Sequence, residues 1–407
     1  MSRLLRPTAV ERSRVSTAQG PVIVWNLIRR CNLACTHCYA ASADKTFHGE
    51  LSQAEIFRVL ADLKASGVPA LILSGGEPLL RPDLFEIASQ AKAMGFYVGL
   101  SSNGTLMDQE QVKRIAQTGF HYVGVSLDGL EASHDQMRGM RGAFRLALDG
   151  IRHCREHGVQ VGIRYTPTQK NIHDLPGLLH LMTEEGIERL YISHWNHAGR
   201  GRVNRAADTD HQSTRRTMES LFDLCRQDLE SGSKREIVTG NNDADGVFFL
   251  LWIVRHLPHL ANRASDMLQR WGGNASGVGI ANIDEQGEVH PDIFWRHHSL
   301  GNVRSRSFSE IWHQTDDPLL NGLRQKPRPV KGRCQLCRYL ALCGGNTRIR
   351  AWQMTGDHWE EDPGCYLMDA EIGLAPGSDP STPPPFFVHD LGSSDKTPKS
   401  TIGDVIP

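Results

Sequence analysis

Three cysteines near the N-terminus have the spacing of a metal-cluster site. Cys31, Cys35 and Cys38 form a C-x3-C-x2-C pattern directly after the apolar run at residues 22–25. This run predicts a strand, so the three thiols would converge in the loop that follows it. A four-iron cluster normally takes four thiolates, and three would leave one iron open to a small molecule. Taken alone, these cysteines would also fit a zinc site or three buried thiols.

A second motif follows the next apolar run. Residues 71–74 predict a buried strand, and Gly75, Gly76 and Glu77 come directly after it. Glycines let the backbone approach a ligand closely, and a carboxylate accepts hydrogen bonds from an ammonium group. Such a loop alone is more often an ordinary turn. Because it comes soon after the three cysteines, the sequence favours one binding site that both motifs share.

Further apolar runs recur along the chain and end in polar residues. They begin near residues 98, 122 and 161, and helical stretches separate them. This alternation predicts βα units around a parallel sheet. Asn103, Ser126 and Arg164 stand at or near the ends of these runs, where parallel sheets place their ligands. We therefore expect these side chains at the same edge of the sheet as the cysteine loop.

A second group of cysteines lies near the C-terminus. Cys334, Cys337 and Cys343 form a C-x2-C-x5-C pattern, and Cys365 follows. Four thiolates are a complete set for a closed four-iron cluster, and a structural zinc site would use the same residues. The other two of the nine cysteines fall in helical patterns and are expected in the core.

Together the motifs resemble the radical S-adenosylmethionine (SAM) family, whose CxxxCxxC loop holds a [4Fe–4S] cluster with one iron bound to SAM. The resemblance implies that Cys31, Cys35 and Cys38 hold this cluster. It also implies that the segment Gly75 to Glu77 binds the SAM amino group. The other implied SAM contacts are Tyr39 on the adenine side and, along the ribose and carboxylate, Asn103, Ser126, Arg138 and Arg164. For these last four, a solvated loop or a capping role is an equal alternative.

The resemblance also implies the architecture, an α/β fold with two units. A partial (β/α)6 radical SAM barrel would cover residues 20–235. A small α+β auxiliary-cluster domain of the SPASM or twitch type would cover residues 236–371. An N-terminal arm would occupy residues 1–19. We expect a disordered tail at residues 372–407, where proline-rich and Ser/Lys-rich sequence lacks apolar periodicity.

The C-terminal region departs from the seven-cysteine pattern of the SPASM extension. Asn274 and Asp292 stand where this pattern has cysteines, as does Thr347. The four cysteines that remain correspond to the outer cluster of the pattern. We therefore predict one auxiliary [4Fe–4S] cluster, and no second one, besides the SAM-binding cluster.

Two segments are rich in histidine, arginine and tryptophan, at residues 193–202 and 290–298. Arginine binds carboxylates through paired hydrogen bonds, tryptophan offers a flat apolar face, and histidine can ligate iron. A flat, iron-bearing substrate with several carboxylates would use all three. His290, His297 and His298 are the candidates for ligation of substrate iron.

Over about residues 20–370 the chain is similar to the tetrapyrrole-modifying branch of the family, above all to its members in heme d1 biosynthesis. This similarity implies that 12,18-didecarboxysiroheme is the substrate and that two propionates are replaced by oxo groups. Heme synthases, which convert propionates of iron-coproporphyrin to vinyl groups, and peptide-modifying SPASM enzymes share nearly every motif. An electron donor such as flavodoxin or ferredoxin is the implied protein partner.

Composition limits the classes of partner and the cellular compartment that are expected for this protein. The formal net charge of −1 argues against a nucleic-acid partner held by phosphate contacts. No apolar stretch approaches the ~20 residues of a membrane helix, and the N-terminus lacks the apolar core of a signal peptide. Cysteines arranged as cluster sets fit a reducing cytoplasm better than a disulfide scaffold. The sequence thus predicts a cytoplasmic enzyme and leaves its oligomeric state open.

Overall fold

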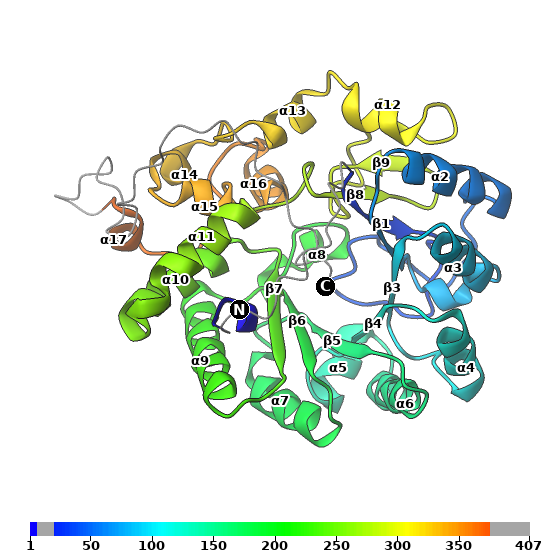
Figure 1. Ribbon diagram of the computed structural model, residues 1–407, viewed down its shortest axis with the longest axis horizontal. Coiled ribbons are helices and arrows are strands. Elements are labelled where there is room, and N and C mark those ends of the chain that lie inside the picture. The colour runs from blue at the N-terminus through cyan, green and yellow to red at the C-terminus, as the bar shows by residue number, and fades with distance from the viewer. Residues whose placement is uncertain (6–19, 375–407) are drawn as a thin grey trace.

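A single mixed sheet forms the centre of the computed structural model, which describes residues 1–5 and 20–374 (Figure 1). The strand order is β10-β9-β8-β1-β2-β3-β4-β5-β6-β7, and neighbours from β8 to β7 pair in parallel. The strands are β1 (Val22–Asn26), β2 (Ala70–Ser74), β3 (Tyr97–Ser102), β4 (Tyr122–Ser126), β5 (Val161–Tyr165), β6 (Arg189–Ser193), β7 (Glu236–Gly240), β8 (Ile280–Ile283), β9 (Glu288–His290) and β10 (Gly301–Asn302).

Helices follow the successive parallel strands and cover the outside of the curved sheet (Figure 1). The helices of the barrel are α1 (Ser2–Leu5), α2 (Gln53–Ala65), α3 (Leu84–Ala93), α4 (Gln109–Thr118), α5 (Glu131–Arg138), α6 (Ala143–Glu156), α7 (Leu175–Glu184), α8 (Arg200–Val203) and α9 (His211–Glu230). The later helices are α10 (Ala244–His256), α11 (Ala261–Trp271), α12 (Phe308–His313), α13 (Pro318–Arg324), α14 (Gly332–Leu336), α15 (Leu340–Cys343), α16 (Arg348–Thr355) and α17 (Asp369–Ile372). Within the described residues, no helix is long and apolar enough to cross a membrane.

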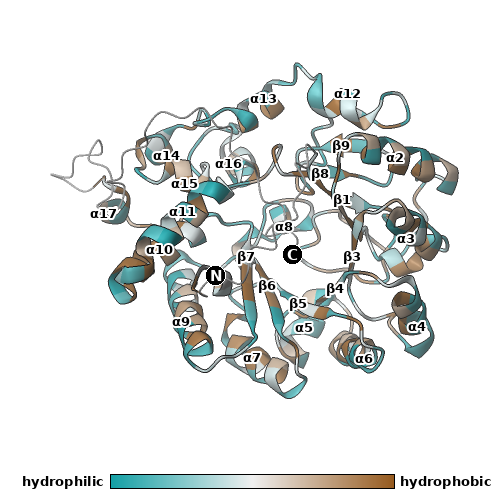
Figure 2. Cartoon of the chain, in the orientation of Figure 1, coloured by the Kyte–Doolittle hydropathy of each residue, from teal (hydrophilic) through white to brown (hydrophobic). Residues whose placement is uncertain are grey.

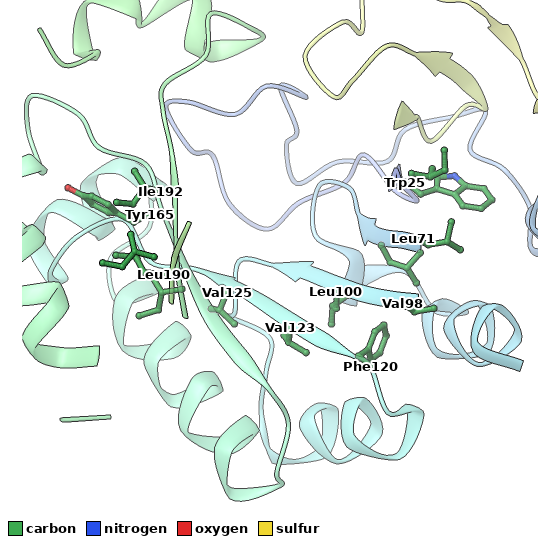
Figure 3. Packing of buried hydrophobic residues seen from close by; sticks show 14 of the residues in the cluster. Trp25, Leu71, Val98, Leu100, Phe120, Val123, Val125, Tyr165, Leu190 and Ile192 are labelled. Carbon is green, nitrogen blue, oxygen red and sulfur yellow. The ribbon is translucent and has the colours of Figure 1, made fainter. Parts of the chain in front are cut away.

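Alternation along each strand gives the sheet two different faces. Successive side chains of a strand point to opposite faces, so every second residue meets the helices. On β4, Val123 and Val125 join the main core, whereas Ser126 faces the inside of the curve. Figure 3 shows core side chains of this kind side by side on adjacent strands. In Figure 2 the strands are largely hydrophobic, whereas the helices carry both hydrophobic and hydrophilic residues. The inner face carries an apolar cluster at Val22, Ala70 and Ile72 and polar residues such as Ser74 and Ser126 where the strands end.

The C-terminal region is joined to the barrel through the sheet itself. β8 pairs in parallel with β1, and the buried Asn282 donates from Nδ2 to Val24 O and to Asn26 Oδ1, both at 2.6 Å. At the other edge, β7 pairs with β6 immediately after the predicted boundary at residue 235. The sheet therefore runs through both predicted units and has more parallel strands than the six expected.

The predicted fold class is confirmed, with an α/β barrel followed by a smaller helical and β-hairpin region. Of the predicted N-terminal arm, residues 1–5 are described. Ser2–Leu5 form α1, and the Ser2 hydroxyl accepts a hydrogen bond from Ile237 N of β7 at 3.1 Å. The predicted tail lies outside the described residues from residue 375 onward.

Aromatic packing between α9 and α10 couples the barrel to the C-terminal region. The buried Phe222 ring lies 5.6 Å from Phe248, 4.6 Å from Phe249 and 6.0 Å from Trp252, centroid to centroid. Because these rings close the side of the barrel beyond β7, the contact bears directly on global stability.

We predict that Phe222→Ala lowers the free energy of unfolding by about 3–5 kcal/mol, since a large buried ring is lost and leaves a cavity. Denaturant titration followed by circular dichroism measures the change. Val203→Ala is the matched control, because Val203 is 79% exposed and should leave the midpoint unchanged. Equal midpoints for both variants would contradict the packing described.

Candidate active site

A cavity of about 480 Å³ lies inside the curved sheet and reaches the carboxyl ends of its parallel strands. Its volume is within the range of about 300–1,000 Å³ typical of ligand pockets. The strands contribute polar residues from the inner face of the sheet, and the loops contribute the cysteines. These lining residues include Cys31, Cys35, Cys38, Ser74, Gly75, Gly76, Ser101, Asn103, Ser126, Arg138, Arg164, Tyr191, Ser193 and His194.

The three N-terminal cysteines converge on this cavity as predicted. They are free thiols, and Cys31 and Cys35 are buried. Backbone N–H groups of Leu33 and Ser42 donate to the sulfurs of Cys31 and Cys38 at 3.5 and 3.4 Å. Burial raises the pKa of Cys31 to about 12, so a metal or cluster would be needed to hold it as a thiolate.

Gly75 and Gly76 hold the cysteine loop in place through the backbone. Gly76 N donates to Ile28 O at 2.6 Å, and Glu77 N donates to Arg30 O at 2.9 Å. A Cβ on Gly75 would lie 2.4 Å from Ile28 O, and one on Gly76 would lie 2.2 Å from Arg30 O. Both positions therefore require glycine, because any side chain would push the segment before Cys31 away.

Glu77 is fully buried and does not line the cavity. Its carboxylate accepts hydrogen bonds from Ser102 Oγ and Asn103 N at 2.8 Å and from Leu79 N at 3.2 Å. Burial raises its pKa to about 7, against the effect of these donors. In this structure the side chain ties β2 to the end of β3, and its contact with SAM stays a prediction.

The other predicted SAM contacts all line the cavity. Tyr39 accepts a hydrogen bond at its hydroxyl from Asn26 Nδ2 at 2.7 Å. Asn103 donates from Nδ2 to Asn32 in the cysteine loop at 2.9 Å. Arg164 crosses Gly124 of β4 and donates to Ser101 Oγ at 2.5 Å. Ser126 completes this polar inner wall.

Arg138 lies behind the cluster loop at the end of α5. It is buried, and its Nη1 lies 3.6 Å from the sulfur of Cys35. Its other terminal nitrogen forms an ion pair with the fully buried Asp128. Burial raises the pKa of Asp128, but Arg138, the two nearby histidines and the backbone N–H of Thr166 together hold it below its usual range. The sequence-based predictions did not include Asp128. Its position two residues after the buried strand β4 was the feature that could have indicated a place in the site.

The segment at residues 193–202 has two separate functions. His194 and Trp195 line the cavity, whereas Arg200 holds the cysteine loop. Arg200 donates from Nε to Cys35 O and from Nη1 to Ser42 O, both at 2.7 Å. Arg200 therefore uses Nε and Nη1 to hold backbone carbonyls of the cysteine loop.

The segment at residues 290–298 lines the cavity with Asp292 and its two following residues, but not with its histidines. His290 Nδ1 is 2.8 Å from His298 O, and His298 Nε2 is 2.8 Å from Asp317. His297 stacks on Trp352 at an interplanar angle of 3°. None of the three histidines lines the cavity and each has another contact, so this arrangement does not support the prediction of an iron ligand among them.

The far wall of the cavity contains the residues that replace the missing cysteines. Asn274, Asp292 and Thr347 all line it. The buried Arg328 fixes this wall by donating to Asn274 Oδ1 at 3.2 Å and to Asn274 O at 2.7 Å. Asp243 accepts a hydrogen bond from Asn274 Nδ2 at 3.0 Å. A polar network thus occupies the place where the SPASM pattern has cysteines.

The four C-terminal cysteines surround a second, small cavity. Cys334, Cys337, Cys343 and Cys365 line it together. Burial raises the pKa of Cys343 well above its ordinary value. Within the described part of the chain, no three His, Cys, Asp or Glu side chains converge on a single-ion site. The four thiols instead surround a shared space.

The donor sets fit the groups that the motifs imply. Three free thiols, of which Cys31 and Cys35 are buried, lie together and include two that accept backbone N–H groups, which suits a cluster with one open iron. The hydroxyl, amide and guanidinium groups on the inner wall suit a polar ligand such as SAM. The C-terminal thiols offer a full set of four ligands.

We predict that Gly76→Ala displaces the cysteine loop, costs about 1–3 kcal/mol or more in stability, and loses the iron held by the N-terminal cysteines. Iron content after anaerobic reconstitution and the unfolding midpoint measure both effects. Gly279→Ala is the control, because its Cβ would meet only Ala275 at 3.6 Å. Full iron content in Gly76→Ala would show that the loop tolerates a side chain.

Asp243 provides a pH-dependent test, because burial raises its pKa to about 6. The folded state then binds this proton more tightly than the unfolded state, so stability falls as pH rises from about 4 to 6. Asp243→Asn should therefore stabilise the protein by on the order of 2 kcal/mol at pH 8 and by less at pH 5. Unfolding midpoints at the two pH values measure this, and equal gains at both would contradict it.

Comparison with known proteins places this site in a family. The Radical SAM superfamily model matches residues 25–182. The chain is 49% identical to the pre-heme d1 synthase of Dinoroseobacter shibae, over 95% of this chain and 96% of that protein. It is 41% identical to the Fe-coproporphyrin III synthase of Methanosarcina barkeri, over 88% and 90%. The AdoMet-dependent heme synthase of the same organism is more distant, at 30% over 84% and 95%.

Solved structures agree on the fold. The Streptococcus suis protein SuiB bound to S-adenosylmethionine superposes with a TM-score of 0.67, over 86% of this chain and 78% of that chain, at 18% identity. Family membership implies SAM and a [4Fe–4S] cluster as cofactors. With its cysteine loop, its parallel barrel and a relative that is 49% identical over nearly its whole length, the chain belongs to the radical SAM superfamily.

Proposed function

We propose that this radical SAM enzyme acts in heme d1 biosynthesis, on 12,18-didecarboxysiroheme. In this proposal it removes two propionate side chains and introduces oxo groups. The observation that carries the proposal is the 49% identity to a pre-heme d1 synthase across nearly both whole chains. A cavity that combines arginine, tryptophan and histidine side chains beside the cysteine loop supports it.

Cys31, Cys35 and Cys38 would hold the SAM-binding cluster, with Arg138 beside Cys35 and Asn103 beside Cys31. When bound, the cluster and SAM supply the electron and the 5′-deoxyadenosyl radical that takes a hydrogen atom from the substrate. The chain contributes position and exclusion of water. Gly75 and Gly76 fix the loop, while Tyr39, Ser126 and Arg164 line the space for SAM.

Arg164 is well placed to bind a carboxylate. Its guanidinium lies 5.6 Å from the centre of the Tyr191 ring and donates to Ser101. Neighbouring Arg189 is already paired with Glu236, at 2.7 Å from Nη2. Arg164 therefore differs from Arg189 in having no acidic partner among its described contacts, and a carboxylate of SAM or of the substrate would provide one.

Cys334, Cys337, Cys343 and Cys365 would hold one auxiliary [4Fe–4S] cluster. Its place borders the cavity wall, because Asn274 N donates to Cys343 O at 3.1 Å. An oxidative step on the substrate releases electrons, and a cluster beside the cavity would accept them. We further propose that a flavodoxin or ferredoxin supplies the initial electron.

Two other tetrapyrrole reactions are the alternatives. Relatives named Fe-coproporphyrin III synthase and AdoMet-dependent heme synthase are less similar to this chain, at 41% and 30% identity. The structural likeness to SuiB concerns the fold alone. Product masses distinguish these reactions from one another.

The deciding experiment is anaerobic incubation of the reconstituted enzyme with SAM, reductant and either didecarboxysiroheme or iron-coproporphyrin. Both 5′-deoxyadenosine and the mass of the tetrapyrrole are followed. Replacement of two propionates by oxygen in the first substrate would support the proposal. Iron-coproporphyrin III as product, or loss of carbon dioxide from the second substrate, would replace it with one of the alternatives. Slow SAM cleavage with neither substrate changed would favour a peptide-modifying role.

We predict that Cys35→Ala abolishes SAM cleavage, because the open-iron cluster loses one of only three ligands. Cys337→Ala should lose about half of the iron and impair turnover more than SAM binding, since each cluster depends on its own thiolates. Iron content and 5′-deoxyadenosine yield measure both effects. Cys154→Ala is the control, because Cys154 is buried among core residues in neither cysteine set. SAM cleavage by Cys35→Ala at the wild-type rate would refute the assignment.

A further inference from the structure

We propose that His194 ligates the iron of the tetrapyrrole substrate and that Asp245 holds its imidazole ring for this purpose. The inference rests on the proposed function, since it requires an iron-bearing substrate in the cavity. It gives His194 the role of iron ligand, because the histidines at residues 290–298 do not line the cavity.

His194 stands at the point where the barrel meets the substrate space. It directly follows β6, and its backbone N–H donates to Gly240 O at the end of β7, at 3.1 Å. The residue is 7% exposed and lines the cavity. Two paired strands thus fix its backbone, which leaves the ring to be oriented by its partners.

Asp245 supplies that orientation from α10. Its Oδ2 lies 2.9 Å from His194 Nε2, and its Oδ1 accepts a hydrogen bond from Tyr366 Oη at 2.6 Å. Asp245 and Tyr366 are each 2% exposed. Both carboxylate oxygens are therefore committed, and the acid cannot turn away from the histidine.

This arrangement selects a metal-binding form of the ring. A carboxylate at Nε2 favours a proton on that nitrogen, which leaves Nδ1 with a free lone pair. No hydrogen bond to Nδ1 is found among the described residues. Histidines that ligate metals typically donate their other ring N–H to a carboxylate or carbonyl, which orients the ring and makes it a stronger ligand.

The other histidines near the cavity are less suited. His37 also lines it, but it lies inside the cysteine loop, with Nε2 3.8 Å from Asp128. His197, three residues after His194, pairs with Asp208 at 3.5 Å and is not part of the cavity wall. Among the described histidines, His194 alone combines a place in the wall outside the cysteine loop with a buried carboxylate partner.

The surroundings of His194 suit a flat macrocycle. Phe249 lies one helical turn after Asp245 on α10 and lines the same cavity, as do Leu268 and Trp271 of the neighbouring α11. These side chains offer apolar surface beside the imidazole. A ring system bound at His194 would thus meet apolar walls and a nitrogen ligand together.

The test uses the reconstituted full chain with ferric didecarboxysiroheme and, as a matched probe, its iron-free form. With the iron–sulfur clusters oxidised, pulsed EPR of the bound ferric probe should show coupling to a histidine nitrogen that changes with ¹⁵N-histidine labelling. His194→Ala should lose this coupling and bind the ferric probe at least about tenfold more weakly. Its affinity for the iron-free probe should stay unchanged, and His197→Ala should keep the wild-type coupling.

Asp245→Asn supplies a second variant that keeps the imidazole. The amide oxygen of asparagine is a weaker hydrogen-bond acceptor than the carboxylate. This variant should therefore bind the ferric probe about 10–100-fold more weakly and shift its ferric g values. If His194→Ala fails to fold, unchanged g values in Asp245→Asn would overturn the proposal by themselves.

The outcomes separate this inference from the proposed function. A wild-type protein that binds neither probe would overturn both. Binding of both probes, with the same histidine coupling in His194→Ala as in wild type, would overturn only the ligation by His194. Binding without any histidine coupling would do the same.

Discussion

The close backbone contact between the ends of β1 and β2 is the constraint on which the site depends. Gly76 and Glu77 donate to the carbonyls of Ile28 and Arg30 just before the first cysteine, and only glycine fits at the contact. This contact fixes where the cysteine loop leaves the sheet. Arg200 then holds the loop from the opposite side of the barrel through two more carbonyls. The loop has little regular structure of its own, so its shape is imposed by these neighbours.

Two buried arginines near the cavity are paired with acidic residues. Arg138 is neutralised by Asp128 behind the cysteine loop, and Arg350 forms a buried two-point contact with Asp362, at 2.9 and 2.8 Å, near the C-terminal cysteines. Such buried pairs cost desolvation and are retained where they fix geometry. Arg350 also donates to Asn241 O at 2.6 Å, so it connects the end of β7 to α16.

The cavity itself is a product of both regions of the chain. The barrel supplies its inner wall, and the C-terminal region supplies the far wall through Asn274, Asp292 and Thr347. Parallel pairing of β8 with β1 brings that wall into place across more than 250 residues of sequence. A ligand that filled the cavity would therefore contact both regions of the chain.

Local patterns in the sequence were enough to predict the α/β class and to identify the two cysteine sets, each of which the structure brings together, and the glycine segment, which lies against the cysteine loop. Cysteine spacing, strand-end glycines and apolar periodicity are local properties of the sequence, and the groups that these residues bind stay a prediction. The sequence could not show that Glu77 ties two strands together, that Arg200 holds the cysteine loop, or that β7 and β8 extend the sheet. It also pointed to His290, His297 and His298, whereas the cavity is lined by His194. These outcomes depend on which residues meet across long sequence separations, and pairing between distant segments has no period or spacing to reveal it. Only the tertiary structure decided them, because burial and partner geometry, not residue type, determine where a histidine or carboxylate points.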